Sequence, residues 1–119
     1  MTVLDASAAL AFLQGEKGSD VVKQHLSESV IGAANLAEVL TRLGGSVERS
    51  LAEAILVASG VRTEPVSADD ARRGAQIKDS RPGLSLGDRL CLALADRLDD
   101  VALTADGAWG TSDRITQIR

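Results

Sequence analysis

Short apolar runs alternate along this chain with longer stretches in which apolar residues recur at helical spacing. Thr2-Val3-Leu4 is the first run and ends at Asp5, after which an Ala- and Leu-rich stretch is helical by composition. In 36–43 the apolar residues fall at i, i+3, i+4 and i+7, the clearest helical period in the chain. The same criteria predict helices at 19–28, 46–58, 67–78 and 85–98, and strands at 30–31, 61–66, 101–103 and 115–118.

Polar residues and glycines mark the expected ends of these helices. The expected N-caps are Ser19, Asn35, Ser46 and Ser67, and the last helix begins at Ser85 or Gly87. Gly44-Gly45 and Gly60 are expected to end two of the helices. Short apolar strands separated by helices predict an α/β fold, with a small parallel sheet of four to five strands and helices on both faces.

Length and composition are those of one soluble domain. The chain has 119 residues, of which 45% are hydrophobic and 25% charged. Its one cysteine, Cys91, cannot form an internal disulfide, which fits a reducing cytoplasm. The first residues lack the basic region of an export signal, and no stretch approaches the roughly 18 apolar residues of a membrane span. We therefore expect a cytoplasmic protein without a membrane anchor.

Charge and aromatic content limit how the chain could bind nucleic acid. The net charge is −4, which argues against binding through bulk electrostatic attraction. The stretch from Arg72 to Arg97 is different, because its six basic and three acidic residues give a local charge of +3. With one Trp, one Phe and no Tyr, stacking on bases is not available as a main binding device. Any nucleic-acid partner would be held by its backbone.

Four acidic residues are expected near one edge of the sheet. Asp5 ends the first strand and Asp106 follows 101–104, so both should lie at the carboxyl ends of strands, where ligand sites gather. Glu38 and Asp88 fall in the first turns of helices and lie close to strand-exit loops. Four carboxylates brought together would repel one another unless cations neutralised them. Oxygen-only ligands select Mg²⁺ or Mn²⁺ rather than zinc, so the arrangement predicts a site for one of these ions.

Each of these acidic residues also has a local explanation. Asp5 can be the N-cap of the helix that follows it, and Asp88 is favoured by the dipole of its helix. Glu38 lies opposite an apolar stripe and can be a solvated surface residue, and Asp106 before a glycine is an ordinary turn residue. The functional interpretation depends on all four lying near one edge of the sheet.

Four segments of the chain resemble, in order and spacing, the acidic motifs of PIN-domain ribonucleases, and in particular the VapC toxins of toxin–antitoxin (VapBC) pairs. They are Val3-Leu4-Asp5-Ala6-Ser7-Ala8, Asn35-Leu36-Ala37-Glu38-Val39-Leu40, Leu84-Ser85-Leu86-Gly87-Asp88-Arg89 and Leu103-Thr104-Ala105-Asp106. The resemblance implies a single PIN-like nuclease domain over 1–119 with metal-dependent endoribonuclease activity. It also implies inhibition by a cognate antitoxin and a homodimeric state.

The resemblance assigns roles to individual residues. Asp5, Glu38, Asp88 and Asp106 match the metal-binding acids of the family, while Ser7 and Thr104 match small polar residues near that site. We expect Asp5 and Asp88 to be the main metal ligands, Glu38 a ligand or water-positioning base, and Asp106 a ligand directly or through water. Ser7 and Thr104 would orient these carboxylates. Arg89, beside Asp88, is a possible contact to RNA phosphates.

Three other functions are consistent with part of the pattern. A phosphoryl-transfer enzyme of the haloacid-dehalogenase kind normally has a second Asp where this chain has Ser7. A receiver domain would need a late Lys after a strand, and no Lys follows Lys78. The third is a non-catalytic PIN-like binding or regulatory module, and metal-dependent cleavage would distinguish the nuclease from it.

Overall fold

Five parallel strands form the centre of the computed structural model, which describes residues 1–119. They lie in the order β3-β2-β1-β4-β5, so β1 is in the middle of the sheet. The strands are β1 (Thr2–Leu4), β2 (Ser29–Gly32), β3 (Arg62–Glu64), β4 (Val101–Thr104) and β5 (Ile115–Gln117). The predicted parallel sheet is therefore confirmed, with five strands.

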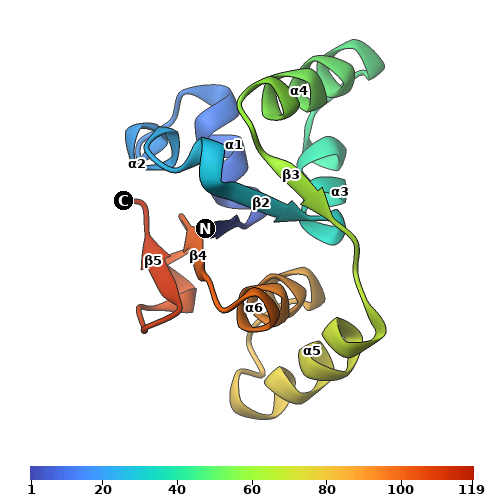
Figure 1. Ribbon diagram of the computed structural model, residues 1–119, viewed down its shortest axis with the longest axis vertical. Coiled ribbons are helices and arrows are strands. Elements are labelled where there is room, and N and C mark those ends of the chain that lie inside the picture. Colours follow the sequence, from blue (N-terminus) through green and yellow to red (C-terminus); the bar gives the residue numbers. More distant parts are fainter.

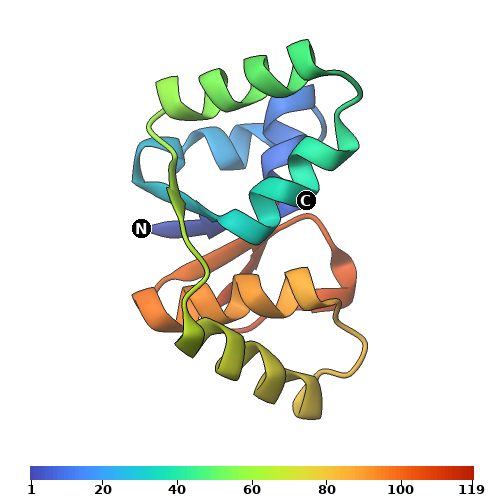
Figure 2. The same ribbon diagram turned by 90° about the vertical axis from the view of Figure 1, so that its right-hand side faces the viewer.

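Helices cover both faces of this sheet, as predicted. Figure 1 shows α1–α4 together on one side of the sheet and α5 with α6 on the other, and Figure 2 shows the same layers from the side. The helices are α1 (Ala6–Gln14), α2 (Ser19–Lys23), α3 (Ala33–Arg42), α4 (Ser46–Ala58), α5 (Ala68–Ser80) and α6 (Leu86–Leu98). Two 3₁₀ turns complete the chain, at Leu26–Glu28 and Gly107–Trp109. No helix has both the length and the apolar character needed to cross a membrane.

The core is divided by the sheet into two apolar layers. Successive side chains of a strand point to opposite faces, so Leu4 packs with the α1–α4 layer and Val3 with the α5–α6 layer. Cys91 and Trp109 are both buried in the second layer.

Three of the predicted N-caps are wrong, and glycines occupy those positions instead. Gly18, Gly32 and Gly45 precede α2, α3 and α4, and none of them caps its helix with a side chain. The polar residues we expected as caps lie inside the helices. Ser19 and Ser46 are each the first helical residue, and Asn35 is in the first turn of α3. By contrast, Ser67 and Ser85 do cap α5 and α6.

The predicted bounds of several elements also need correction, including the helix expected at 36–43, which spans Ala33–Arg42. The helix expected at 19–28 ends at Lys23, and a separate 3₁₀ turn follows. At the other end of α2, the N-cap residue Gly18 has a positive φ of 97°. A Cβ there would lie 2.8 Å from the carbonyl oxygen of Ile118, so the backbone conformation and the close packing both favour glycine at this position. The strand expected at 61–66 spans only Arg62–Glu64, because Pro65 has no N–H to continue the ladder. The helix expected at 67–78 extends to Ser80.

An ion pair between a buried aspartate and an exposed arginine holds α5 against α6. Asp70 accepts hydrogen bonds from Nε and Nη2 of Arg97 at 2.8 and 3.1 Å, and its side chain is 4% exposed. Asp70 also completes a capping box with Ser67 at the start of α5. Although burial alone raises it, the pKa of Asp70 is held below its ordinary value by the hydrogen bonds from Arg97 and Ser67.

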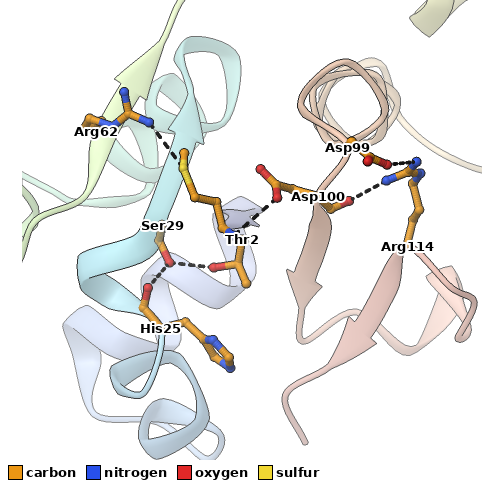
Figure 3. A network of polar contacts seen from close by, with 8 residues as sticks. Thr2, His25, Ser29, Arg62, Asp99, Asp100 and Arg114 are labelled. Carbon is orange, nitrogen blue, oxygen red and sulfur yellow. Dashed lines mark hydrogen bonds and ion pairs between the residues drawn. The ribbon is translucent and has the colours of Figure 1, made fainter.

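Polar contacts close the amino edge of the sheet, at the opposite end of the strands from the four acidic residues. Figure 3 shows Thr2 and Ser29 joined through their hydroxyls, which lie 2.7 Å apart, and Ser29 also donates to the carbonyl oxygen of His25 at 2.6 Å. Across β1 from these residues, just before β4 and β5, Arg114 donates to the Asp100 carbonyl and to the Asp99 side chain. These contacts tie the starts of neighbouring strands to one another and to the preceding turns. None of them involves the four acidic residues at the carboxyl edge.

Replacing Ser29 by Ala is expected to destabilise the protein by about 1–3 kcal/mol, because it removes two hydrogen bonds and leaves the buried Thr2 hydroxyl without its partner. Urea unfolding of the wild type and the variant measures this. Ser50→Ala, an exposed serine on α4, is the control and should change stability by less than about 0.5 kcal/mol. Equal unfolding midpoints for the wild type and Ser29→Ala would contradict the prediction.

Candidate active site at the carboxyl edge of the sheet

A cleft of about 90 Å³ lies at the carboxyl edge of the sheet, and all four acidic residues singled out from the sequence line it. They come from four separate segments: the end of β1, helix α3, the first turn of α6 and the loop after β4. The remaining lining residues are Ala6, Ser7, Leu10 and Arg42. Folding therefore brings together residues up to 101 positions apart, Asp5 and Asp106.

Asp5 is the most buried of the four, with 4% of its surface exposed. Its backbone N–H donates to the carbonyl of Leu103 on β4, and its carboxylate caps α1 by accepting from the Ala8 N–H at 2.7 Å. The hydroxyls of Ser7 and Thr104 also donate to this carboxylate, at 2.7 and 2.5 Å. Burial raises the pKa of Asp5, these hydrogen bonds lower it in part, and the nearby charge of Asp88 raises it further.

The two hydroxyls also connect Asp5 to the loop that carries Asp106. Thr104 Oγ1 accepts from the Asp106 N–H at 3.0 Å, and Ser7 Oγ accepts from the Ala105 N–H at 2.8 Å. Asp106 then caps the following 3₁₀ turn through the Ala108 N–H at 2.9 Å. Ser7 and Thr104 therefore hold both the Asp5 carboxylate and the backbone beside Asp106 in fixed positions.

Glu38 is held in the cleft by a residue whose role the sequence did not reveal. Asn35, 2% exposed, donates from its side-chain amide to Glu38 Oε1 at 2.9 Å and to the carbonyl oxygen of Gly87 at 3.2 Å. It therefore joins α3 to the start of α6. The spacing of three residues from Glu38 on one helix is the only signal in the sequence for this contact.

Gly87 allows the Glu38 carboxylate to approach α6 this closely. A Cβ at position 87 would overlap Glu38 Oε1, because the two atoms would lie closer than such atoms can pack. A side chain at this position in the first turn of α6 would therefore shift the flexible end of Glu38 from the place it has in the cleft.

Asp88 both caps the start of α6 and lines the cleft. It forms a capping box with Ser85, in which Asp88 Oδ2 accepts from the Ser85 N–H at 3.1 Å and Ser85 Oγ accepts from the Asp88 N–H at 3.2 Å.

The buried thiol of Cys91, three residues after Asp88 on α6, lies within the electrostatic influence of the cleft. Burial raises the pKa of this thiol, and the charges of Asp5, Asp88 and Glu38 raise it further. Three of the four acidic residues thus act electrostatically on the same buried atom.

The four carboxylates of the cleft are ligands of the kind that a hard divalent cation prefers, although their side chains do not converge on one point. All four are carboxylates, and Glu38, Asp88 and Asp106 each keep one oxygen that accepts no hydrogen bond from the protein. No group of three or more acidic, histidine or cysteine side chains is placed to hold a metal ion in the structure as it stands. Ionised carboxylates repel one another at closer range unless a cation neutralises them.

The arginine that lines the cleft is Arg42, one turn after Glu38 on α3, and the sequence did not single it out. Arg89, the predicted phosphate contact, does not line the cleft. Its Nη1 donates to the carbonyl oxygen of Gly74 on α5 at 2.9 Å, so its side chain lies between α5 and α6. A role for Arg89 in binding RNA stays a prediction.

Solved structures with the same fold include several toxins. The chain superposes on a toxin–antitoxin complex from Klebsiella pneumoniae with a TM-score of 0.82 and 16% identity, over 100% of this chain and 98% of that chain. A DNA-bound VapBC from Salmonella typhimurium gives 0.75 and 16%, over 99% and 98%. VapC20 from Mycobacterium tuberculosis, described as a Sarcin-Ricin loop cleaving toxin, gives 0.72 and 20%, over 95% and 98%.

No curated protein sequence matches the chain. The three solved structures are 16–20% identical to this chain, so they show its fold alone. The comparison with protein families shows to which family the chain belongs. Residues 2–111 match the PIN domain, and this stretch includes all four acidic residues of the cleft together with Ser7 and Thr104. The chain therefore belongs to the PIN domain family.

Proposed function

We propose that this protein is a divalent-metal-dependent endoribonuclease and the toxin of a type II toxin–antitoxin pair. The observation that carries the proposal is the single cleft lined by Asp5, Glu38, Asp88 and Asp106. No histidine or lysine lines the cleft, so general acid–base chemistry by those side chains is not available in it. Its four carboxylates suit Mg²⁺ or Mn²⁺, the ions that oxygen ligands select.

The cleft residues are proposed to have two kinds of role, as metal ligands and as residues that orient those ligands. Asp5 and Asp88 would be the main ligands, with Glu38 as a ligand or water-positioning base and Asp106 as a ligand directly or through water. A bound ion makes water more acidic and neutralises charge on the reacting phosphodiester. Ser7 and Thr104 hold the Asp5 carboxylate in one orientation, and Asn35 does the same for Glu38.

The proposed partners are RNA, a cognate antitoxin and a second copy of the chain. Several structural neighbours are toxin–antitoxin complexes, which supports the antitoxin. Helix α4 exposes Val47, Leu51 and Ile55, spaced by four residues, and such an exposed apolar stripe is typical of a protein interface. Light scattering tests the homodimer, and a monomer at high concentration would contradict it. A ribonuclease with these partners would act in the cytoplasm.

A cleavage time course on total transfer RNA tests the activity. Wild-type protein with Mg²⁺ or Mn²⁺ is expected to cleave, while Asp88→Asn and wild type with a chelator are expected not to. Asp79→Asn, an exposed aspartate on α5, is the matched control for the charge change and should cleave like the wild type. Absence of cleavage by folded wild type, on transfer and ribosomal RNA alike, would favour the non-catalytic PIN-like module instead.

Replacing Gly87 by Ala is expected to lower cleavage about 10- to 100-fold without lowering stability. The added Cβ must push the Glu38 carboxylate aside, which disturbs the orientation of a proposed ligand. Since alanine favours a helix by about 1 kcal/mol over glycine, the fold itself should not suffer. Initial rates and thermal unfolding of the variant measure both effects. Unchanged cleavage by a folded variant would show that the position of Glu38 is unimportant.

A further inference from the structure

A second hollow adjoins the acidic cleft and carries the opposite charge. Its volume is about 330 Å³, and its lining residues are Ser7, Leu10, Gln14, Glu16, Arg42 and Arg119. Ser7, Leu10 and Arg42 also line the acidic cleft, so the two spaces share a wall. Ser7, Leu10 and Gln14 fall at i, i+3 and i+7, which places them on one face of α1. The hollow therefore runs along α1, away from the four carboxylates.

Arg42 stands at the boundary between the two spaces and is available to a ligand. It lies on α3, its side chain is exposed, and neither a hydrogen bond nor an ion pair ties it to another residue. Arg119 lines the same hollow and donates from Nη1 to the carbonyl oxygen of Lys17 at 3.0 Å, which fixes its side chain but uses one of its donors. Glu16 is the one acidic residue in the lining, so two guanidinium groups leave the hollow with a net positive charge.

We propose that this hollow binds the sugar–phosphate unit next to the phosphodiester that is cut, with Arg42 as the residue that positions the strand. The inference rests on the proposed function, since it supplies the substrate site of that reaction. Arg119 would make a second contact to the same backbone.

The chemistry of the two spaces explains why such a contact is needed. Four carboxylates repel a polyanion, so a strand that enters the cleft requires cations close by. An arginine fork suits a phosphate because it can donate two parallel hydrogen bonds. No aromatic residue lines the hollow, so it offers no aromatic platform for bases, and the charge of its two guanidinium groups favours the phosphate backbone as the part recognised. The Gln14 amide adds a donor and an acceptor of the kind a ribose 2′-hydroxyl can use.

Binding and cleavage measured on three variants test the proposal. Binding is measured in an Asp88→Asn background, so that the RNA stays intact, with a fluorescent single-stranded RNA 12-mer of mixed sequence over a range of salt. Arg42→Ala is expected to weaken binding about tenfold and to reduce the slope of log affinity against log salt by about 0.7, the loss of one phosphate contact. Arg42→Lys, which keeps the charge but not the fork, should restore the slope and part of the affinity.

The matched control is Arg49→Ala, an exposed arginine on α4 that lines neither space. With Asp88 intact, Arg42→Ala should raise KM about tenfold while changing kcat much less, and Arg49→Ala should change neither. If wild type cleaves RNA but Arg42→Ala and Arg49→Ala bind and cleave alike, the inference is overturned and the proposed function stands. If wild type neither binds nor cleaves RNA, both fall together.

Discussion

Replacing Asp5 by Asn is expected to reduce metal-dependent RNA cleavage by about a thousandfold, because a neutral amide removes a charge from the centre of the proposed ligand set. The same change should leave the metal-free protein at least as stable as the wild type. Burial raises the pKa of Asp5, so keeping this carboxylate ionised at neutral pH opposes folding. Cleavage rates and thermal unfolding of one preparation test both parts.

The cleavage rate separates a functional residue from a structural one. An acid retained only as the cap of α1 would leave cleavage intact on replacement by Asn, because Asn caps a helix about as well as Asp does. Asp79→Asn is again the control for loss of one negative charge. An Asp5→Asn protein that still cleaves at more than about a tenth of the wild-type rate would remove Asp5 from the ligand set.

Replacing Asp70 by Ala is expected to cost about 2–4 kcal/mol of folding free energy and to lower the unfolding temperature by about 10 °C. The variant loses the capping box of α5 and two charge-assisted hydrogen bonds from Arg97. Asp69→Ala is the matched control, because the neighbouring Asp69–Arg72 pair is exposed and such pairs contribute less than about 1 kcal/mol. Similar losses for the two variants would contradict this account.

The contribution of Asp70 should also depend on pH in a fixed direction. Its pKa is lower in the folded protein than in the unfolded chain, so its ionisation favours folding. This stabilisation is fully present above the unfolded pKa of about 4 and is lost as the pH falls through the folded value. The gap in stability between wild type and Asp70→Asn, measured by urea unfolding, should therefore narrow on acidification from about pH 5. A gap that is constant or widens would show that the charge of Asp70 does not matter.

The sequence predicted the acidic cleft largely because the local and functional roles of its residues coincide. Asp5 and Asp106 each cap a turn or helix that begins directly after a parallel strand, and such a cap necessarily lies at the carboxyl edge of the sheet. Asp88 belongs to a capping box in the first turn of α6. A cap is recognisable in sequence, and in this fold it also places a carboxylate where ligand sites form.

By itself the sequence determined the order of strands and helices, the parallel sheet and the edge at which the acidic residues lie, because periodicity and caps are local properties of the chain. The tertiary structure alone decided that Asn35 supports Glu38, that Gly87 makes room for it, and that Arg42, rather than Arg89, lines the cleft. These contacts depend on how α3 packs against α6 and α1. Side chains from distant helices meet only when the sheet and its two layers are assembled, and no local pattern encodes that packing.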